Sequence, residues 1–288
     1  MGHMGGPGGR GPMGPNVGRA QEKLPIQGVK YLVAVASGKG GVGKTTVAVN
    51  LALALSKLGA RVGLLDADVY GPNVPLMLGT SEQPRGTAER TIIPVEAQGL
   101  RVISMGLLSP GDAPVIWRGP MLHSVIQQFL RSVEWGELDY LILDLPPGTG
   151  DVQLTLIQTV PLTGAIIVTT PSVVALADVR KAIEMFRQVN VEILGVVENM
   201  SSFICPHCEK SVDVFGHGEG KRTADQAGVP LLGEIEIDPR IRIGGDSGKP
   251  VALLGESAPP ARSIYAMARA VMSRLAEARV AAPTVEIL

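Results

Sequence analysis

The residues with the clearest chemical meaning are Gly38–Thr45, which read GKGGVGKT and fit the phosphate-loop pattern G-x-x-x-x-G-K-[ST]. An apolar, β-branched run, Tyr31–Ala36, precedes them, and an alanine- and leucine-rich helical stretch, Lys44–Leu58, follows. A strand, a glycine-rich turn and a helix start together aim backbone N–H groups and the helix dipole at an anion. Lys44 would contact the β- and γ-phosphates, and the Thr45 hydroxyl would ligate Mg²⁺. The sequence therefore predicts a nucleoside triphosphate site.

Three carboxylates follow other strand-like runs and extend this chemistry. Asp66 ends the run Val62–Leu65, Asp68 follows it closely, and Asp144 ends the run Tyr140–Leu143, as the acid of a Walker-B motif does. An acid in such a position can serve the Mg²⁺ shell or orient the attacking water. A single aspartate there could simply cap a turn. Three acids at strand ends beside a phosphate loop favour a catalytic site instead.

Cys205 and Cys208 are the only cysteines, and their C-x-x-C spacing has several uses. Such a pair can be a redox couple, half of a metal site, or a chance pair of free thiols. It lies late in the chain, in the loop-like segment 201–218. In thioredoxin-type proteins such a pair lies at the start of a helix that follows an early strand. Two thiolates cannot complete a tetrahedral zinc site or a four-thiolate [4Fe–4S] site. A twofold homodimer could supply two more thiolates, or His207 or His217 could complete a zinc site within one chain.

Composition narrows the class of protein. The chain has 288 residues, of which 45% are hydrophobic, so a large core can form. Its net charge of −1 argues against a general nucleic-acid or anionic-membrane binder. It has no run long enough to span a membrane and no signal-peptide core, so a cytoplasmic location is expected. Residues 1–23 are rich in Gly and Pro and include an apparent tag scar, Gly2-His3-Met4, so we expect a disordered tail there and one folded domain over 24–288.

The elements that must position these residues follow from the spacing of apolar positions. Strand-like runs are Tyr31–Ala36, Val62–Leu65, Leu100–Met105, Tyr140–Leu143, Ala165–Thr169, Ile193–Val197 and Leu231–Ile235. Helical stretches are Lys44–Leu58, Met121–Val133, Val174–Val189, Gly220–Ala227 and Arg262–Ala278. Strands that are apolar on both faces and alternate with helices indicate a parallel sheet covered on both sides. We expect a single α/β P-loop NTPase domain with a mostly parallel, doubly wound sheet and ligands at the carboxyl ends of its strands.

Several motifs in order resemble one family closely. They are Asp66–Asn73, Trp117–Met121 (WRGPM), Asp144–Asp151 (DLPPGTGD) and Cys205–Cys208. Together with Lys39, which resembles the signature lysine of the deviant Walker-A ATPases such as MinD and ParA, they resemble the Mrp-type (ApbC-like) iron–sulfur cluster carrier ATPases.

This resemblance implies an ATPase with a Mg²⁺–ATP site. The implied nucleotide contacts are Gly38, Lys39, Gly40, Gly41, Val42, Gly43, Lys44, Thr45, Thr46, Asp66, Asp144 and Asn199, and the implied catalytic residues are Lys39, Lys44 and Asp68. Lys39 would reach the phosphates of a partner subunit. Asn199, just past the run Ile193–Val197, would read adenine, although an asparagine there can also be a plain turn former.

The resemblance further implies that Cys205 and Cys208 hold one [4Fe–4S] cluster across a homodimer interface. Apo iron–sulfur proteins and a cluster-assembly scaffold would be the partners, with no nucleic acid and no membrane. The alternative is a MinD- or ParA-like positioning switch with a structural zinc site. A basic surface or a membrane helix would favour that alternative, and the sequence shows neither. The amphipathic stretch Arg262–Ala278 is expected to pack on the core.

Overall fold

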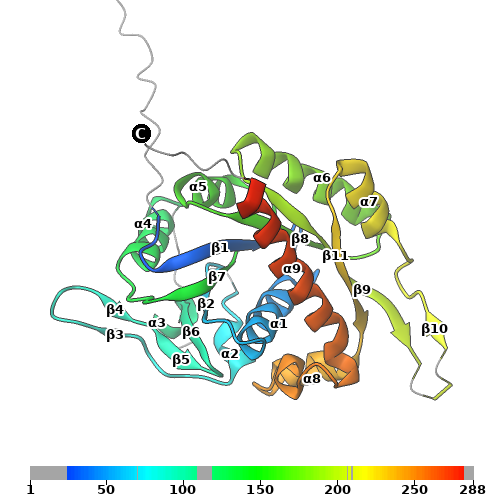
Figure 1. The fold of residues 1–288 in the computed structure, drawn as a ribbon, viewed down its shortest axis with the longest axis horizontal. Coiled ribbons are helices and arrows are strands. Elements are labelled where there is room, and N and C mark those ends of the chain that lie inside the picture. Colours follow the sequence, from blue (N-terminus) through cyan, green and yellow to red (C-terminus); the bar gives the residue numbers. More distant parts are fainter. Residues whose placement is uncertain (1–24, 70, 109–118, 206, 209, 282–288) are drawn as a thin grey trace, which may run out of the picture.

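The computed structural model describes residues 25–69, 71–108, 119–205, 207–208 and 210–281 (Figure 1). A sheet of nine strands forms the centre of this part of the chain, in the order β10-β9-β8-β1-β7-β2-β6-β5, with β11 also paired to β9. The strands are β1 (Val29–Ala36), β2 (Val62–Asp66), β5 (Val95–Ala97), β6 (Leu100–Ser104), β7 (Leu138–Asp144), β8 (Gly164–Thr169), β9 (Ile193–Ile204), β10 (Ser211–Val212) and β11 (Leu231–Ile237). Two further short strands, β3 (Arg85–Gly86) and β4 (Ile92–Ile93), form a separate antiparallel hairpin.

The sheet is mostly parallel, as expected. β1 lies between β7 and β8, β2 between β7 and β6, and β9 between β8 and β11, all in parallel pairs. Only the edge strands β5 and β10 pair antiparallel within this sheet of the described chain. Parallel pairing brings the carboxyl ends of β1, β2 and β7 to one edge, which is where such sheets bind ligands.

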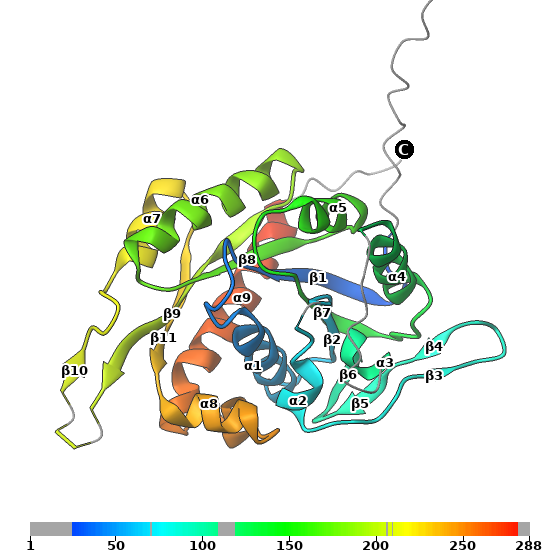
Figure 2. The ribbon, with the colours of Figure 1, turned by 180° about the vertical axis from the view of Figure 1, so that it is seen from behind.

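Helices cover both faces of the sheet (Figures 1 and 2). The helices are α1 (Lys44–Lys57), α2 (Val74–Leu78), α3 (Met105–Leu108), α4 (Gly119–Arg131), α5 (Asp151–Thr159), α6 (Val173–Gln188), α7 (Glu219–Ala227), α8 (Pro239–Asp246) and α9 (Arg262–Ala281), with short 3-10 turns at Val251–Leu254 and Pro259–Ala261. Alternate residues of β1 enter two separate cores: Val33 and Val35 pack in the core that contains α1 and α9, and Leu32 and Ala34 in the core that contains α4 to α7. This two-sided burial explains the continuous apolar runs of the strands.

The expected C-terminal helix packs on the core, as its pattern predicted. Ile264, Met267, Val271 and Leu275 of α9 are each at most 1% exposed and belong to the core that contains α1. Among the described residues, no helix is both long enough and apolar enough to cross a membrane.

The structure corrects one expectation about β9. The strand does not end at Val197 but continues to Ile204, so Asn199 lies inside it and the segment 201–218 is not all loop. Pairing explains the extension: β10 pairs with Phe203 and Ile204 on one edge, and β11 pairs with the strand as far as Phe203 on the other. The polar residues of β9 beyond Val197 have a local propensity for turns, and pairing with these two strands holds them in the sheet. Two predictions concern residues outside the described part of the chain: the whole tail 1–23, and the first two residues of Trp117–Met121.

Candidate functional site

The phosphate loop joins β1 to α1 at the carboxyl edge of the sheet, with a backbone conformation that needs glycine. Gly43 caps α1 with φ of 80°, in the left-handed region. The Asn199 side chain donates from Nδ2 to the Val42 carbonyl oxygen at 2.9 Å, and a side chain on Gly43 would overlap this amide. The loop is therefore positioned by β9 as well as by its own strand and helix.

Lys44 lies at the base of the site between two carboxylates. Its Nζ is 2.6 Å from Asp144 Oδ1 and 3.7 Å from Asp68 Oδ2. The Thr45 hydroxyl donates to the other Asp144 oxygen at 2.7 Å. Lys44 is 6% exposed and Asp144 is fully buried, so this charge cluster interacts through protein rather than water. The predicted convergence of the phosphate loop with the ends of β2 and β7 is observed.

Asp66 lies one strand further along the same edge, where β2 and β7 place it beside Asp144 in register. It is fully buried and accepts hydrogen bonds from Ser104 Oγ at 2.8 Å and from the backbone N–H of Asp68 at 3.1 Å. Burial, and then the charge of Asp144, raise the pKa of Asp66 to about 8. Burial also raises the pKa of Asp144, and Lys44 opposes that rise. A cation that enters here would meet two carboxyls that are costly to ionise without it.

A cavity of about 570 Å³ opens above these residues, within the size range of sites for small molecules. Its phosphate-loop side is lined by Ser37, Lys39, Gly40, Gly41, Gly43, Lys44, Thr45 and Thr46. Asp68, Asn199, Met200 and Phe215 also line it, and Phe215 is 52% exposed. Of the predicted nucleotide contacts, Gly38, Val42, Asp66 and Asp144 are not part of the lining. Asp144 instead bonds Lys44 and Thr45, which do line the cavity.

Sequence reasoning missed one wall of this cavity. Residues at the end of β11 and in α8 line it, including Asp238 and Arg242, together with Asn73 and Leu76 at the start of α2. The sequence does carry a local signal for the start of α8, an aspartate followed by a proline at the first helical position. In the structure Asp238 caps the helix by accepting a hydrogen bond from the Arg240 backbone N–H. Nothing in the sequence indicates that this helix start faces the phosphate loop.

The two cysteines lie beyond β9 on the connection to β10. The Cys205 backbone N–H donates to the Lys210 carbonyl at 3.0 Å, which closes a hairpin. Cys205 is half-buried, Cys208 is exposed, and both are free thiols. Hydrogen bonds from the backbone N–H groups of His207 and Cys208 lower the pKa of Cys205, which favours the thiolate that metals and electrophiles require. His207 lies beside the cysteines, whereas His217 lies with two glutamates, Glu198 and Glu234.

Apolar side chains that are exposed to solvent surround this hairpin. Ile204 is 55% exposed, Val212 is 49%, Val214 is 51% and Phe215 is 52%. A concentration of exposed apolar side chains in one region is typical of an interaction surface.

Comparison with known proteins decides the family. A family model described as ParA, NUBPL iron-transfer P-loop NTPase, matches residues 28–272. The chain belongs to this family. The predicted relationship and fold class are thereby confirmed, and membership makes the chain a P-loop ATPase.

Relatives and solved structures agree with this family. The chain is 54% identical to an iron–sulfur cluster carrier protein of Deinococcus radiodurans, over 89% of this chain and 73% of that protein. It is 48% identical to an Arabidopsis thaliana protein described as an iron–sulfur protein required for NADH dehydrogenase, mitochondrial, over 91% of this chain and 84% of that protein. A nucleotide-binding protein of Archaeoglobus fulgidus, solved with ADP and with cobalt detected, has a TM-score of 0.72 at 38% identity, over 83% of this chain and 93% of that chain. The MinD structure of Pyrococcus furiosus has a TM-score of 0.63 at 24% identity, over 85% of this chain and 99% of that one, and shows the shared fold alone.

Proposed function

We propose that this chain is an ATP-hydrolysing carrier that binds one [4Fe–4S] cluster between two copies of itself and passes it to apo-proteins. The observation that carries the proposal is the hairpin after β9 that presents Cys205 and Cys208, the only thiols in the chain, at the surface. The names of the relatives, which include cluster carrier and cluster transfer proteins, support the same role. A scaffold that assembles clusters would be the donor.

The dimer follows from ligand number. A [4Fe–4S] cluster takes four thiolates, and one chain offers two. A twofold axis beside the hairpin places the same two thiolates of a second copy opposite the first. The exposed apolar side chains Ile204, Val212, Val214 and Phe215 would be buried by the same contact. Cluster binding and dimer formation are therefore one event in this proposal.

The nucleotide site assigns a role to each residue around the cavity. The loop Gly38–Thr46 would bind the phosphates of ATP, and Lys44 would exchange its carboxylate partners for them. Mg²⁺ fits the oxygen donors present, because the Thr45 hydroxyl and Asp144 carboxylate lie 2.7 Å apart with Asp66 behind them. Bound there, Mg²⁺ would neutralise charge on the phosphates.

Asp68 and Lys39 would act on hydrolysis itself. Asp68 lies at the cavity wall, 9% exposed, and would orient the attacking water. Lys39 also lines the cavity and would contact the phosphates of the second copy. The Ser37 hydroxyl donates to the Lys39 carbonyl oxygen at 2.9 Å and fixes the backbone from which that lysine extends.

Strand β9 connects the two sites. Asn199 contacts the phosphate loop through Val42, Met200 lines the cavity, and the same strand ends one residue before Cys205. Any ATP-driven change in the approach of the two subunits would alter the cluster's ligands. By linkage, a bound cluster would change the affinity for nucleotide by the same factor by which nucleotide changes the affinity for the cluster.

Anaerobic reconstitution tests this function. The wild-type chain should take up about four sulfide per two chains, together with the iron of one [4Fe–4S] cluster, and show broad visible absorption. Cys205→Ala and Cys208→Ala should each abolish sulfide uptake and this absorption while ATP binding, measured by calorimetry, stays within about threefold of wild type, since the phosphate loop is intact. His207→Ala is the matched control and should keep the cluster. Retention of the cluster in both cysteine variants would contradict the proposal.

The alternative function, a positioning switch of the MinD or ParA kind with structural zinc, has weaker support. The MinD structures share the fold at 24% identity or less. Zinc bound by one chain would have to use His207, because the described structure groups His217 with Glu198 and Glu234. The cytoplasmic location and the division into a tail, 1–23, and one ATPase domain, 24–288, stay predictions.

A further inference from the structure

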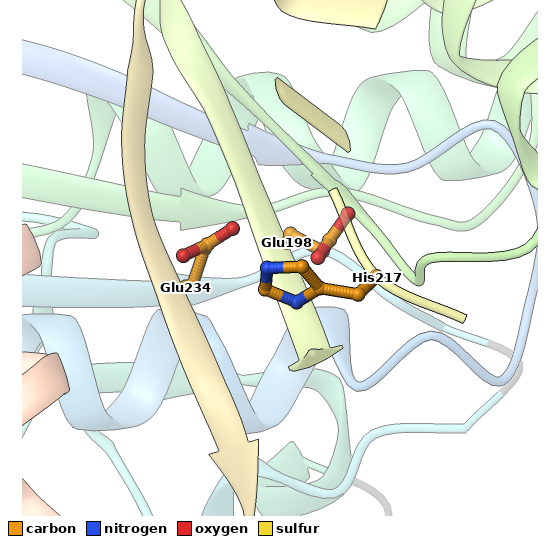
Figure 3. Close-up of side chains that lie close together, drawn as sticks. All are labelled: Glu198, His217 and Glu234. Atoms are coloured by element: carbon orange, nitrogen blue, oxygen red, sulfur yellow. The ribbon is translucent and has the colours of Figure 1, made fainter. Parts of the chain in front are cut away.

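A second group of metal-ligating side chains lies apart from the cysteines and the phosphate loop (Figure 3). Glu198 comes from β9, Glu234 from β11, and His217 from the segment between β10 and α7. The three side chains point toward one another in Figure 3, and one ligand atom from each lies within 4.8 Å of the others. Glu198 is buried, Glu234 is half-buried and His217 is exposed, so the group is open to solvent on the His217 side.

Strand pairing forces the two glutamates together. Glu198 and Glu234 are partners in the parallel register of β9 and β11, so their side chains leave the sheet side by side on the same face. Like charges in neighbouring positions on a sheet repel and destabilise it. A compensating cation between them would remove this repulsion.

Glu198 has an unused ligand atom inside the group. Its side chain is fully buried, and its Oε2 accepts a hydrogen bond from the Gly220 backbone N–H at the start of α7. Its Oε1 is buried and has no hydrogen-bond partner. A buried carboxylate oxygen without a partner costs free energy, whereas a bound cation would satisfy it.

We propose that Glu198, His217 and Glu234 bind a first-row divalent transition-metal ion. One imidazole nitrogen with two carboxylates is a ligand set that suits zinc, cobalt and ferrous iron better than Mg²⁺ or Ca²⁺, which take oxygen ligands. Bonds of about 2.1 Å in a tetrahedral arrangement put ligand atoms roughly 3.4 Å apart. The three ligand atoms lie within 4.8 Å of one another, so each pair needs to approach by at most about 1.4 Å. Rotation of the exposed His217 side chain can bring it closer to both carboxylates, and rotation of the half-buried Glu234 side chain can bring it closer to Glu198. Solvent would fill the remaining position.

The ion would attach the cysteine hairpin to the body of the protein. His217 lies on the return from β10 to α7, and Phe215, two residues earlier, lines the nucleotide cavity. Glu198 and Asn199 are consecutive in β9 and face opposite sides of the sheet, Glu198 toward α7 and Asn199 toward the phosphate loop. A metal at Glu198 would therefore fix the return segment from behind the strand that positions the nucleotide loop.

Cobalt titration tests the site without the cysteines. The background is the full chain with Cys205→Ala and Cys208→Ala, free of nucleotide. We expect about one high-affinity Co²⁺ per chain, with ligand-field absorption and no thiolate-to-cobalt charge-transfer band. His217→Ala and Glu234→Gln should each weaken this binding at least tenfold, since each removes a direct ligand. His207→Ala, the loss of another exposed histidine, is the matched control and should leave it unchanged.

A stability measurement gives a second reading of the same site. A ligand that binds only the folded state of a protein raises the melting temperature of that protein. Zn²⁺ or Co²⁺ should therefore raise the melting temperature of the cysteine-free chain and of His207→Ala, but not of His217→Ala. Absence of high-affinity Co²⁺ binding in the cysteine-free chain would overturn the proposal. Equal affinity with and without His217, in variants that circular dichroism shows to be folded, would also overturn it.

Discussion

Asp66 makes the stability of the nucleotide-free protein depend on pH in a direction opposite to that of ordinary surface carboxylates. Burial, and then the charge of Asp144, raise the pKa of Asp66 in the folded protein from its ordinary value of 3.8 to about 8. Between these two values the folded state keeps a proton that the unfolded state has lost. The free energy of unfolding therefore falls as pH rises through this window. Below the window both states are protonated, and above it the loss is complete.

The magnitude follows from linkage. Each pH unit well inside the window costs about 1.4 kcal/mol, and the slope declines as pH approaches the folded pKa. Between pH 6 and pH 8, the contribution of Asp66 alone is about 2 kcal/mol of lost stability. Asp66→Asn mimics the protonated carboxyl and should remove this contribution.

Urea unfolding at pH 6 and at pH 8, without nucleotide or divalent metal, measures the difference. We expect the wild-type chain to lose about 2 kcal/mol more than Asp66→Asn over this interval. Asp139→Asn is the control: Asp139 pairs with Arg61 at 3.2 Å, and this pairing lowers the pKa of Asp139. Its contribution is present above the unfolded pKa and is lost only in acid, so this variant should keep the wild-type pH dependence. Equal pH dependence in wild type and Asp66→Asn would show that Asp66 does not hold a proton in the folded protein at pH 6.

Three further substitutions test the roles around the cavity. Lys44→Ala should weaken ATP binding at least about 30-fold in calorimetry, because it removes a charge-assisted contact in a buried site; near-normal affinity would contradict this. Asp68→Ala should lower kcat about 100-fold while ATP affinity stays within about threefold, since Asp68 would orient the attacking water in the transition state. A large loss of ATP affinity with unchanged kcat would instead assign Asp68 to the binding of Mg²⁺ and ATP in the ground state. Lys39→Ala should impair hydrolysis in dimeric protein with little effect on ATP binding by the monomer, and unchanged turnover would exclude a role across the interface.

The phosphate loop and its acids could be predicted because their determinants are local. A glycine-rich octapeptide between an apolar strand and a helix specifies its own backbone, and the acids follow directly on strands whose parallel pairing is signalled by two-sided burial. Lys44 and Asp144 therefore meet where the sequence places them, 2.6 Å apart.

The parts that sequence reasoning missed depend on pairing between distant segments. The extension of β9 through Asn199 to Ile204 depends on β10 and β11 as neighbours, and residues such as Asn199 and Ser201 carry no strand signal of their own. The pairing of Glu198 with Glu234 likewise exists only in the register of β9 and β11. The cavity wall from α8 depends on the path of the chain after β11, which no local pattern encodes.

Native mass spectrometry of anaerobically reconstituted protein tests whether two copies of the chain share one cluster, because it reports subunit number and metal content in the same ion. We expect a dimer that carries the mass of one [4Fe–4S] cluster, and only cluster-free protein when Cys205 or Cys208 is replaced by alanine. A metal that depends on Cys205 and Cys208 but is held by a single chain, with the mass of one zinc ion, would contradict a cluster shared between two copies.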